Sequence, residues 1–356
     1  MMKECGHTVY LYAGEQNEAP CHELVPCISE VERSAVVGNG HYVNASFDIS
    51  LPHWKAFNAN AARAIAERAQ PHDFLCLIAG QSHKPIADAL PALMAVEFGI
   101  GYGGTFARYR VWESYAWMHV CYGASTSNSH SADGQWFDAV IPNSFEVEDF
   151  PFRECKDDYY LFIGRLIDRK GVQIAADACE AAGRRLIIAG YGTPPGYGEY
   201  IGIVGPQERG RLMAGARAVL APTVYIEPFG GVVVEAMMCG TPVITTDWGA
   251  FTETNIHGVT GFRCRMFHEF ASALDQVNNL DPKAIRDHAI ANYSLDAIGP
   301  KYDAYFRRLE TLWKDGWYQR IYGDKPGKVV MPDTKPTAAT PLPIPGEPGG
   351  AVHSHA

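Results

Sequence analysis

The stretch that decides the fold runs from Glu227 to Ile244 and reads EPFGGVVVEAMMCGTPVI. Its loop ends in two glycines, Gly230 and Gly231, an apolar helix follows, and a Gly-Thr-Pro turn leads into a strand. Paired glycines at a helix start let a ligand approach the backbone closely, and the unpaired N–H groups there favour an anion such as a diphosphate. Glu227 precedes the helix and Glu235 lies inside it, and a carboxylate can accept two hydrogen bonds from adjacent hydroxyls of a ribose or a sugar ring. The plainer interpretation is a chain turn with two solvated glutamates.

A second cluster lies upstream, at residues 162–171, and reads FIGRLIDRKG. It follows an apolar strand and opens a helix, so it leaves the carboxyl edge of a parallel sheet, where ligands bind. Arg165 can bind two phosphate oxygens at once, and Lys170 adds a point charge. Taken alone, this cluster could equally be a solvated run of charges. Two such loops in one chain favour an anion site.

Apolar runs and segments of helical period alternate along most of the chain, which predicts an α/β protein with parallel sheets. The strands expected in the N-terminal half are 8–13, 22–29, 73–79, 95–100 and 139–142, and the helices are 52–69, 84–94 and 112–122. In the second half we expect strands at 160–163, 185–189, 218–221 and 242–246, and helices at 171–182, 206–216, 231–239, 267–280 and 282–292.

The length of 356 residues argues for two domains, at roughly 150 residues each. The acidic segment 143–152, which contains proline and lacks either periodicity, is the expected boundary, so the predicted domains are 1–150 and 151–299. Residues 300–323 are expected to hold a C-terminal helix that packs back on the domains. Residues 324–356 are rich in Pro, Gly, Thr and Ala, and this composition predicts a disordered tail.

Composition excludes several classes of protein. The net charge of −10 and the isoelectric point of about 5.7 provide no general attraction for nucleic acid or anionic membranes. No run reaches the ~18 apolar residues of a transmembrane helix, and the N-terminus lacks a signal-peptide pattern, so we expect a cytoplasmic protein. The nine cysteines are scattered without a Cys-x-x-Cys pair, and no Asp-x-Asp occurs, so no metal site is expected.

Residues 158 to about 265 resemble the donor-binding domain of family 4 (GT4) retaining glycosyltransferases, which have the GT-B architecture of two Rossmann-like domains facing a cleft. The resemblance rests on a set of segments in a fixed order. They are Gly164-Arg165-Leu166 with Lys170-Gly171, Ile188 to Gly192, Gly205 before a helix, Pro222 to Ile244, Thr246 to Gly249 and His257 to Phe262.

The resemblance implies a retaining transfer of a sugar from a nucleotide-diphosphate sugar, UDP by default, to an acceptor hydroxyl, with no metal and no other cofactor. Glu227 would lie beside the transferred sugar and Glu235 would hold the ribose. Arg165 and Lys170 would bind the diphosphate and, with Glu227, form the catalytic set. The remaining residues expected at the donor site are Gly164, Gly190, Tyr191, Phe229, Gly230, Gly231 and Val232, of which Gly230–Val232 supply backbone amides.

The N-terminal half matches that family only loosely. The first strand-loop-helix unit is expected to be missing, which would shorten this domain. Two loops after predicted strands, 80–85 and 99–104, are candidates for the acceptor side and contain Ser82, His83 and Tyr102. Glu113 joins them, because residues 111–117 replace the family's usual histidine segment. Plain turn chemistry is the alternative for both loops.

Other functions stay open on the sequence alone. The fold also suits a sugar-nucleotide epimerase or a phosphorylase, and a chain lacking its first unit could bind nucleotide sugars without catalysis. The acceptor could be a glycan, a lipid-linked sugar, a protein or a small molecule, with a modified nucleic-acid base as a minority option that the negative charge disfavours.

Overall fold

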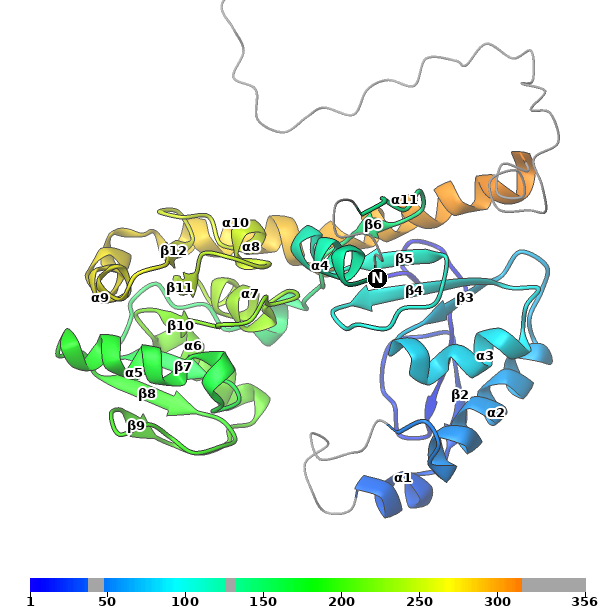
Figure 1. Cartoon of the computed structure of the whole chain (residues 1–356), viewed down its shortest axis with the longest axis horizontal. Helices are drawn as coiled ribbons and strands as arrows, with labels where there is room; N and C mark the ends of the chain where they lie inside the picture. The colour runs from blue at the N-terminus through cyan, green and yellow to red at the C-terminus, as the bar shows by residue number, and fades with distance from the viewer. Residues whose placement is uncertain (38–47, 126–131, 316–356) are drawn as a thin grey trace, which may run out of the picture. The chain divides into compact units, whose positions relative to one another are not determined.

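The described part of the protein contains two sets of parallel strands, one in each half of the chain, which form three sheets (Figure 1). The computed structural model describes residues 1–37, 48–125 and 132–315. Residues Met1–Thr311 form one compact unit, which contains both sets of strands, and a second unit begins at Leu312. Among the helices within these ranges, none is long and apolar enough to cross a bilayer.

The N-terminal half has a two-stranded and a four-stranded parallel sheet. The first pairs β1 (Tyr10–Gly14) with β2 (Glu23–Ile28), and the second has the order β3 (Phe74–Leu77), β4 (Met94–Ile100), β5 (Tyr109–Trp112), β6 (Ala139–Val140). The helices are α1 (Glu30–Val37), α2 (Pro52–Ala66), α3 (Lys84–Ala89) and α4 (Tyr115–Ser125), with 3-10 turns at Gly80–His83 and Val147–Asp149. Buried side chains of strands and helices form one core: Cys27, Ala61, Ile65, Leu75, Leu77 and Ile86.

The second half is a six-stranded parallel sheet covered on both faces. Its order is β12 (Gly261–Cys264), β11 (Val243–Thr246), β10 (Val219–Ala221), β7 (Tyr160–Ile163), β8 (Leu186–Ala189), β9 (Glu199–Tyr200). The helices are α5 (Val172–Ala181), α6 (Pro206–Gly215), α7 (Gly231–Met238), α8 (Phe251–Thr254), α9 (Phe267–Gln276) and α10 (Pro282–Tyr293), with 3-10 turns at Asp168–Lys170 and Val277–Asn279.

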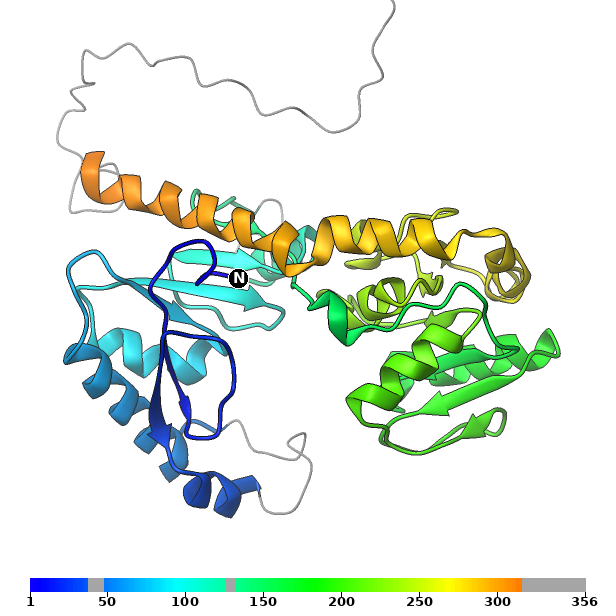
Figure 2. The ribbon, with the colours of Figure 1, turned by 180° about the vertical axis from the view of Figure 1, so that it is seen from behind.

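Alternation along each strand explains the two covered faces. Leu161 and Ile187 join a core with α6, α7 and α10, whereas Tyr160 and Ile188 join a separate core with α5 and α9. Successive side chains of a strand point to opposite faces, so a strand that is apolar throughout must be buried on both. Figures 1 and 2 view this sheet from opposite sides, with α5 in front in the first and α6 in the second.

The strand order places the site. The chain runs outward from β7 to β8 and β9, then returns to the other side of β7 with β10. Ligands of open parallel sheets bind at the carboxyl ends of the strands where the order reverses, which here is between β7 and β10. The loops that leave these two strands are the two glycine-containing loops singled out in the sequence.

Most predicted elements are confirmed within a few residues, and two predicted helices differ. The helix predicted at 112–122 is wrong at its start: Trp112 ends β5, where it pairs with β4 and β6 and is fully buried, and the helix begins at Tyr115. The helix predicted at 84–94 ends at Ala89, because Met94 starts β4. Strands β5, β9 and β12 and helices α1 and α8 were not expected.

The long helix α11 (Leu295–Asp315) begins five residues before the predicted one and contains Pro300. It contacts the N-terminal half, since Tyr305 donates a hydrogen bond to the carbonyl of Phe137 at 2.9 Å and the ring of Phe306 lies 4.9 Å from that of Phe74. The remainder of the predicted segment, 316–323, and the predicted tail 324–356 lie outside the described residues.

Candidate functional site

Glycine lets the loops after β7 and β8 run against each other. Gly190 has φ +144°, and a β-carbon there would overlap the carbonyl oxygen of Gly164. The contact continues along the loops, because the N–H of Leu166 donates to the carbonyl of Tyr191 at 2.8 Å. Any side chain at position 190 would push the two loops apart. Three of the predicted donor residues, Gly164, Gly190 and Tyr191, therefore lie together.

Lys170 and Glu227 join the loops after β7 and β10. Lys170 Nζ lies 2.7 Å from Glu227 Oε2, and their side chains are 21% and 11% exposed. The ring of Tyr225 lies beside them, with its centroid 5.0 Å from Lys170 Nζ and 4.8 Å from the guanidinium carbon of Arg169. The loops can come this close because Gly171 faces the carbonyl of Pro222, which a β-carbon would overlap. The switch point thus holds a partly buried ion pair.

Arg165 differs from its neighbours. It is exposed, and among the described residues no hydrogen bond or ion pair engages its guanidinium group. Its loop is held by backbone contacts, including the N–H of Ile167 to the Arg165 carbonyl at 3.0 Å. An unengaged guanidinium group on a fixed loop is available to a bidentate anion.

The helix α7 starts beside Glu227 without a side-chain cap. Gly230 has φ +77°, and a β-carbon there would lie 2.5 Å from the ring of Phe251, so glycine is required. The first N–H groups of a helix have no partner within the helix, and Gly231 and Val232 occupy these positions here. Phe229 is buried and stacks on Phe145 at 6.2 Å, so it supports the loop from beneath.

Glu235 is engaged by a residue that the sequence analysis missed. Its Oε2 forms an ion pair with Arg209 of α6. Its other oxygen, Oε1, faces Gly231 one helical turn earlier, 4.0 Å from the position of a β-carbon on that glycine. Burial raises the pKa of Glu235, and the charge of Arg209 opposes this rise. Arg209 stands in a charged helix, Glu208-Arg209-Gly210-Arg211, in which no spacing marks it out.

The loops of the N-terminal half meet residues 227–231 of the second half at a cavity of about 340 Å³. Two of the predicted acceptor-side residues, Tyr102 and Glu113, line it. The complete lining is Gly99, Gly101, Tyr102, Glu113, Asn143, Glu227, Pro228, Phe229, Gly230 and Gly231. The contributing strands β4, β5 and β6 present their carboxyl ends there, as β10 does from the other sheet.

Glu113 has no cationic partner among the described residues. Oε1 accepts a hydrogen bond from Asn143 at 2.9 Å, and the carboxylate lies against Gly101, where a β-carbon would overlap Oε2. Burial raises the pKa of Glu113, the Asn143 hydrogen bond opposes this, and the charge of Glu227 raises it further. The cavity thus receives two carboxylates, of which Lys170 compensates one.

The two halves are tied together next to this cavity. Ser114 donates a hydrogen bond to the carbonyl of Pro228 at 2.6 Å. Glu253 of α8 accepts from the backbone N–H groups of Tyr115 and Ala116 at 3.0 and 2.7 Å, so it caps the start of α4. Contacts between the two halves therefore hold the cavity walls together.

Ser82 and His83 do not line the cavity. His83 packs against the rings of Trp54 and Phe57 and bonds Asn58 at 2.9 Å through Nδ1, and burial lowers its pKa. The carbonyl of Ser82 accepts a hydrogen bond from the same Asn58 side chain. Their loop reaches the site only indirectly, since Gly80 lies against the ring of Tyr102. An acceptor role for these two residues stays a prediction.

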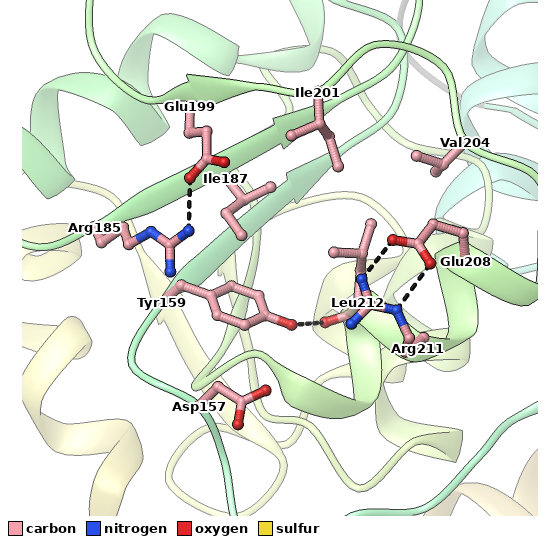
Figure 3. A pocket seen from close by; sticks show the side chains of 10 residues that line it. All are labelled: Asp157, Tyr159, Arg185, Ile187, Glu199, Ile201, Val204, Glu208, Arg211 and Leu212. Carbon is pink, nitrogen blue, oxygen red and sulfur yellow. Dashed lines mark hydrogen bonds and ion pairs between the residues drawn. The ribbon is translucent and has the colours of Figure 1, made fainter.

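A larger cavity, of about 570 Å³, lies at the amino ends of β7, β8 and β9 (Figure 3). Arg185 pairs there with Glu199, Arg211 pairs with Glu208, and Tyr159 donates to the carbonyl of Leu212 at 2.8 Å. None of the predicted site residues lines it. Its two arginines already have carboxylate partners, so the cavity at the carboxyl ends is the better candidate.

Among the described residues, no group of three or more His, Cys, Asp or Glu side chains is arranged to hold a metal ion.

Part of the chain is similar to known glycosyltransferases. Residues 157–279 match the family model described as "Glycosyl transferases group 1". An uncharacterized glycosyltransferase of Methanocaldococcus jannaschii is 35% identical over 118 residues, which cover 28% of this chain and 30% of the relative. The chain spans half or less of the length of this relative and of the other curated relatives that it matches.

Solved structures extend the likeness to both halves. AviGT4, a glycosyltransferase involved in avilamycin A biosynthesis, superimposes with a TM-score of 0.63 at 23% identity and covers 87% of each chain. HepE of Anabaena in complex with UDP-glucose gives a TM-score of 0.56 at 18% identity, over 72% of this chain and 82% of that one. With two sets of parallel strands and these neighbours, the chain has the GT-B fold.

Proposed function

We propose that this chain, whose residues 157–279 carry the group 1 glycosyltransferase match, transfers a sugar from a nucleoside diphosphate sugar to an acceptor hydroxyl. The observation that carries the proposal is the Lys170–Glu227 ion pair at the strand-order switch, beside the uncapped start of α7. A diphosphate and a sugar need adjacent cationic and hydrogen-bond-accepting groups, and this pair supplies both, with Glu227 lining the cavity and Lys170 bound to it. The fold alone would not carry the proposal, since one fold hosts many functions.

In the proposed mechanism, the chain stabilises the departing diphosphate. Arg165 binds two of its oxygens, Lys170 adds a charge, and the N–H groups of Gly231 and Val232 donate to it. Hydrogen-bond donors and cations that are already in place where negative charge develops account for a large part of such catalysis. Glu227 lies beside the transferred sugar, where its carboxylate accepts from sugar hydroxyls. These positive groups support a transfer that needs no metal ion, which chelator treatment during turnover would test.

Retention of the anomeric configuration is part of the proposal. The bond from the sugar to the diphosphate breaks with oxocarbenium character, the acceptor hydroxyl attacks from the same face, and its proton passes to the departing diphosphate oxygen. Proton NMR of the first product formed gives the anomeric configuration directly. An inverted product would contradict this part while leaving the transfer itself intact.

On the acceptor wall, Glu113 is the group that we propose accepts a hydrogen bond from the incoming hydroxyl. It is partly buried, its side chain lies between Gly101 and Asn143, and it faces the same cavity as Glu227. Tyr102 would contact the acceptor beside it. A glycan, a lipid-linked sugar or a small molecule could each supply such a hydroxyl.

Calorimetric titration with UDP, GDP and ADP tests the donor site first. Saturable binding of one of them is expected, with UDP the first to try because the HepE structure of similar fold contains UDP-glucose. Arg165→Ala should weaken binding about 10- to 100-fold, because a hydrogen-bonded charge is lost. Arg185→Ala is the matched control, since Arg185 belongs to the other cavity. Binding of none of the three nucleotides would contradict the proposal, and binding without turnover of any nucleotide sugar would indicate a non-catalytic binding protein.

A further inference from the structure

Arg209 pairs with Glu235. The sequence predicts that Glu235 holds the ribose of the nucleotide, and it predicts no role for Arg209. Arg209 lies on α6 and Glu235 on α7, and the ion pair joins the two helices. Glu235 has only 16% of its side chain exposed, whereas Arg209 has 40%. A carboxylate this far from water needs a partner to stay charged.

The two oxygens of Glu235 have different surroundings. Oε2 is occupied by Arg209, while Oε1 lies 4.0 Å from the position that a β-carbon of Gly231 would take. Helix side chains lean toward the N-terminus of their helix, so Glu235 leans toward the first turn of α7. Gly231 has no side chain to cover Oε1. A ligand bound to the first N–H groups of α7 would therefore lie next to Oε1.

The same geometry explains why the arginine matters. Burial raises the pKa of Glu235, and a protonated carboxyl group accepts hydrogen bonds poorly. Arg209 opposes protonation and occupies one oxygen, which directs the other toward Gly231. Arg209 Nε is buried and has no hydrogen-bond partner, so the guanidinium group is held mainly through its contact with Glu235.

We propose that Arg209 is a positioning residue that holds the Glu235 carboxylate charged and turned toward the nucleotide, and thereby makes binding depend on the 2′-hydroxyl of the ribose. This inference rests on the proposed function, because it needs a nucleoside diphosphate at the start of α7. It predicts which part of the donor Arg209 controls: the ribose and not the diphosphate.

Calorimetry with UDP, GDP and ADP and with their 2′-deoxy forms tests it. The unaltered protein should bind the preferred nucleotide about 10- to 100-fold more tightly than its 2′-deoxy form. Arg209→Ala should reduce this ratio to about 3-fold or less, mainly because the variant binds the ribonucleotide more weakly. Arg209→Lys should restore part of the ratio, which a merely structural role would not require. Arg209→Gln serves if the alanine variant does not fold.

Arg211→Ala is the matched control, because Arg211 lies on the same helix but pairs with Glu208 at the surface. Its ratio should equal that of the unaltered protein. The inference is overturned if the Arg209 variants keep the full ratio, or if the unaltered protein binds both forms equally. Failure of the unaltered protein to bind any of the six nucleotides would instead overturn the proposed function, and this inference with it.

Discussion

Lys170 Nζ and Glu227 Oε2 lie 2.7 Å apart, although 57 positions separate the two residues in the chain. The contact exists because β10 pairs with β7, which brings the loops after these strands together. Both side chains are mostly buried, so each charge depends on the other. Removing one partner leaves a charge that water can no longer fully solvate.

Replacing Lys170 with methionine should therefore affect both stability and turnover. We expect the free energy of unfolding to fall by about 1–3 kcal/mol, since the pair is partly exposed. Turnover of the nucleotide sugar should fall about 100-fold or more, because a charge that stabilises the leaving diphosphate is lost. Urea unfolding and initial rates measure the two effects. Lys283→Met is the control, since Lys283 pairs with Asp287 at the surface and should change neither. Unchanged turnover in Lys170→Met would remove this residue from the catalytic set.

Gly190→Ala should destabilise the protein by at least about 2 kcal/mol. The added methyl group would overlap the carbonyl oxygen of Gly164, and the backbone at φ +144° is unfavourable for alanine. Thermal unfolding measures the loss. Gly196→Ala is the matched control, because a β-carbon there meets no atom within 4 Å. A variant as stable as this control would show that the two loops are free to separate.

Glu113→Gln should raise the KM for the acceptor and leave binding of the donor unchanged. The amide keeps the size of the side chain but accepts hydrogen bonds less strongly, so we expect KM for the acceptor to rise about 10-fold. Nucleotide affinity should stay the same, because Glu113 comes from the N-terminal half, whereas the α7 start belongs to the second half. Initial rates at varied acceptor and donor concentrations separate the two constants. Equal acceptor constants in both proteins would contradict a role for Glu113.

Glu97→Gln should change how stability depends on pH. Glu97 is fully buried in β4, accepts from the N–H groups of Phe106 and Ala107 at 2.8 and 2.7 Å, and burial raises its pKa. A raised pKa means that the folded state binds the proton more tightly than the unfolded state. The stability from this protonation is present at low pH and is lost as pH rises through the folded pKa.

The glutamine variant cannot ionise, so its stability relative to the unaltered protein should improve as pH rises from 4 to 8, by on the order of 1 kcal/mol. Urea unfolding at several pH values measures the trend. Glu269→Gln should show the opposite trend, because hydrogen bonds from the N–H groups of Arg265 and Met266 lower the pKa of Glu269. Parallel curves for Glu97→Gln and the unaltered protein would mean that Glu97 titrates as it does in the unfolded chain.

The second half of the fold could be predicted closely from the sequence, and the first half less so. The strands at 160–163, 186–189 and 243–246 are short apolar runs bounded by turn residues, so their local pattern suffices. In the first half, the apolar segment around Trp112 fits a helix and a strand equally well by composition. Only the pairing of β5 with β4 and β6 decides for the strand. The predicted absence of the first strand-loop-helix unit and the cytoplasmic location stay predictions.

By itself, the sequence determined which residues could form the two loops that we propose bind the donor: Gly164 to Lys170 after one strand and Glu227 to Gly231 before a helix. These are local properties, since glycine, charge and apolar periodicity act over a few neighbouring residues. Tertiary structure alone decided the partners, bringing Glu227 to Lys170, Glu235 to Arg209 and Glu113 to the same cavity, while it left His83 among aromatic rings. The physical reason is that these contacts depend on strand order and helix packing, and no local pattern specifies which distant loops a sheet brings together.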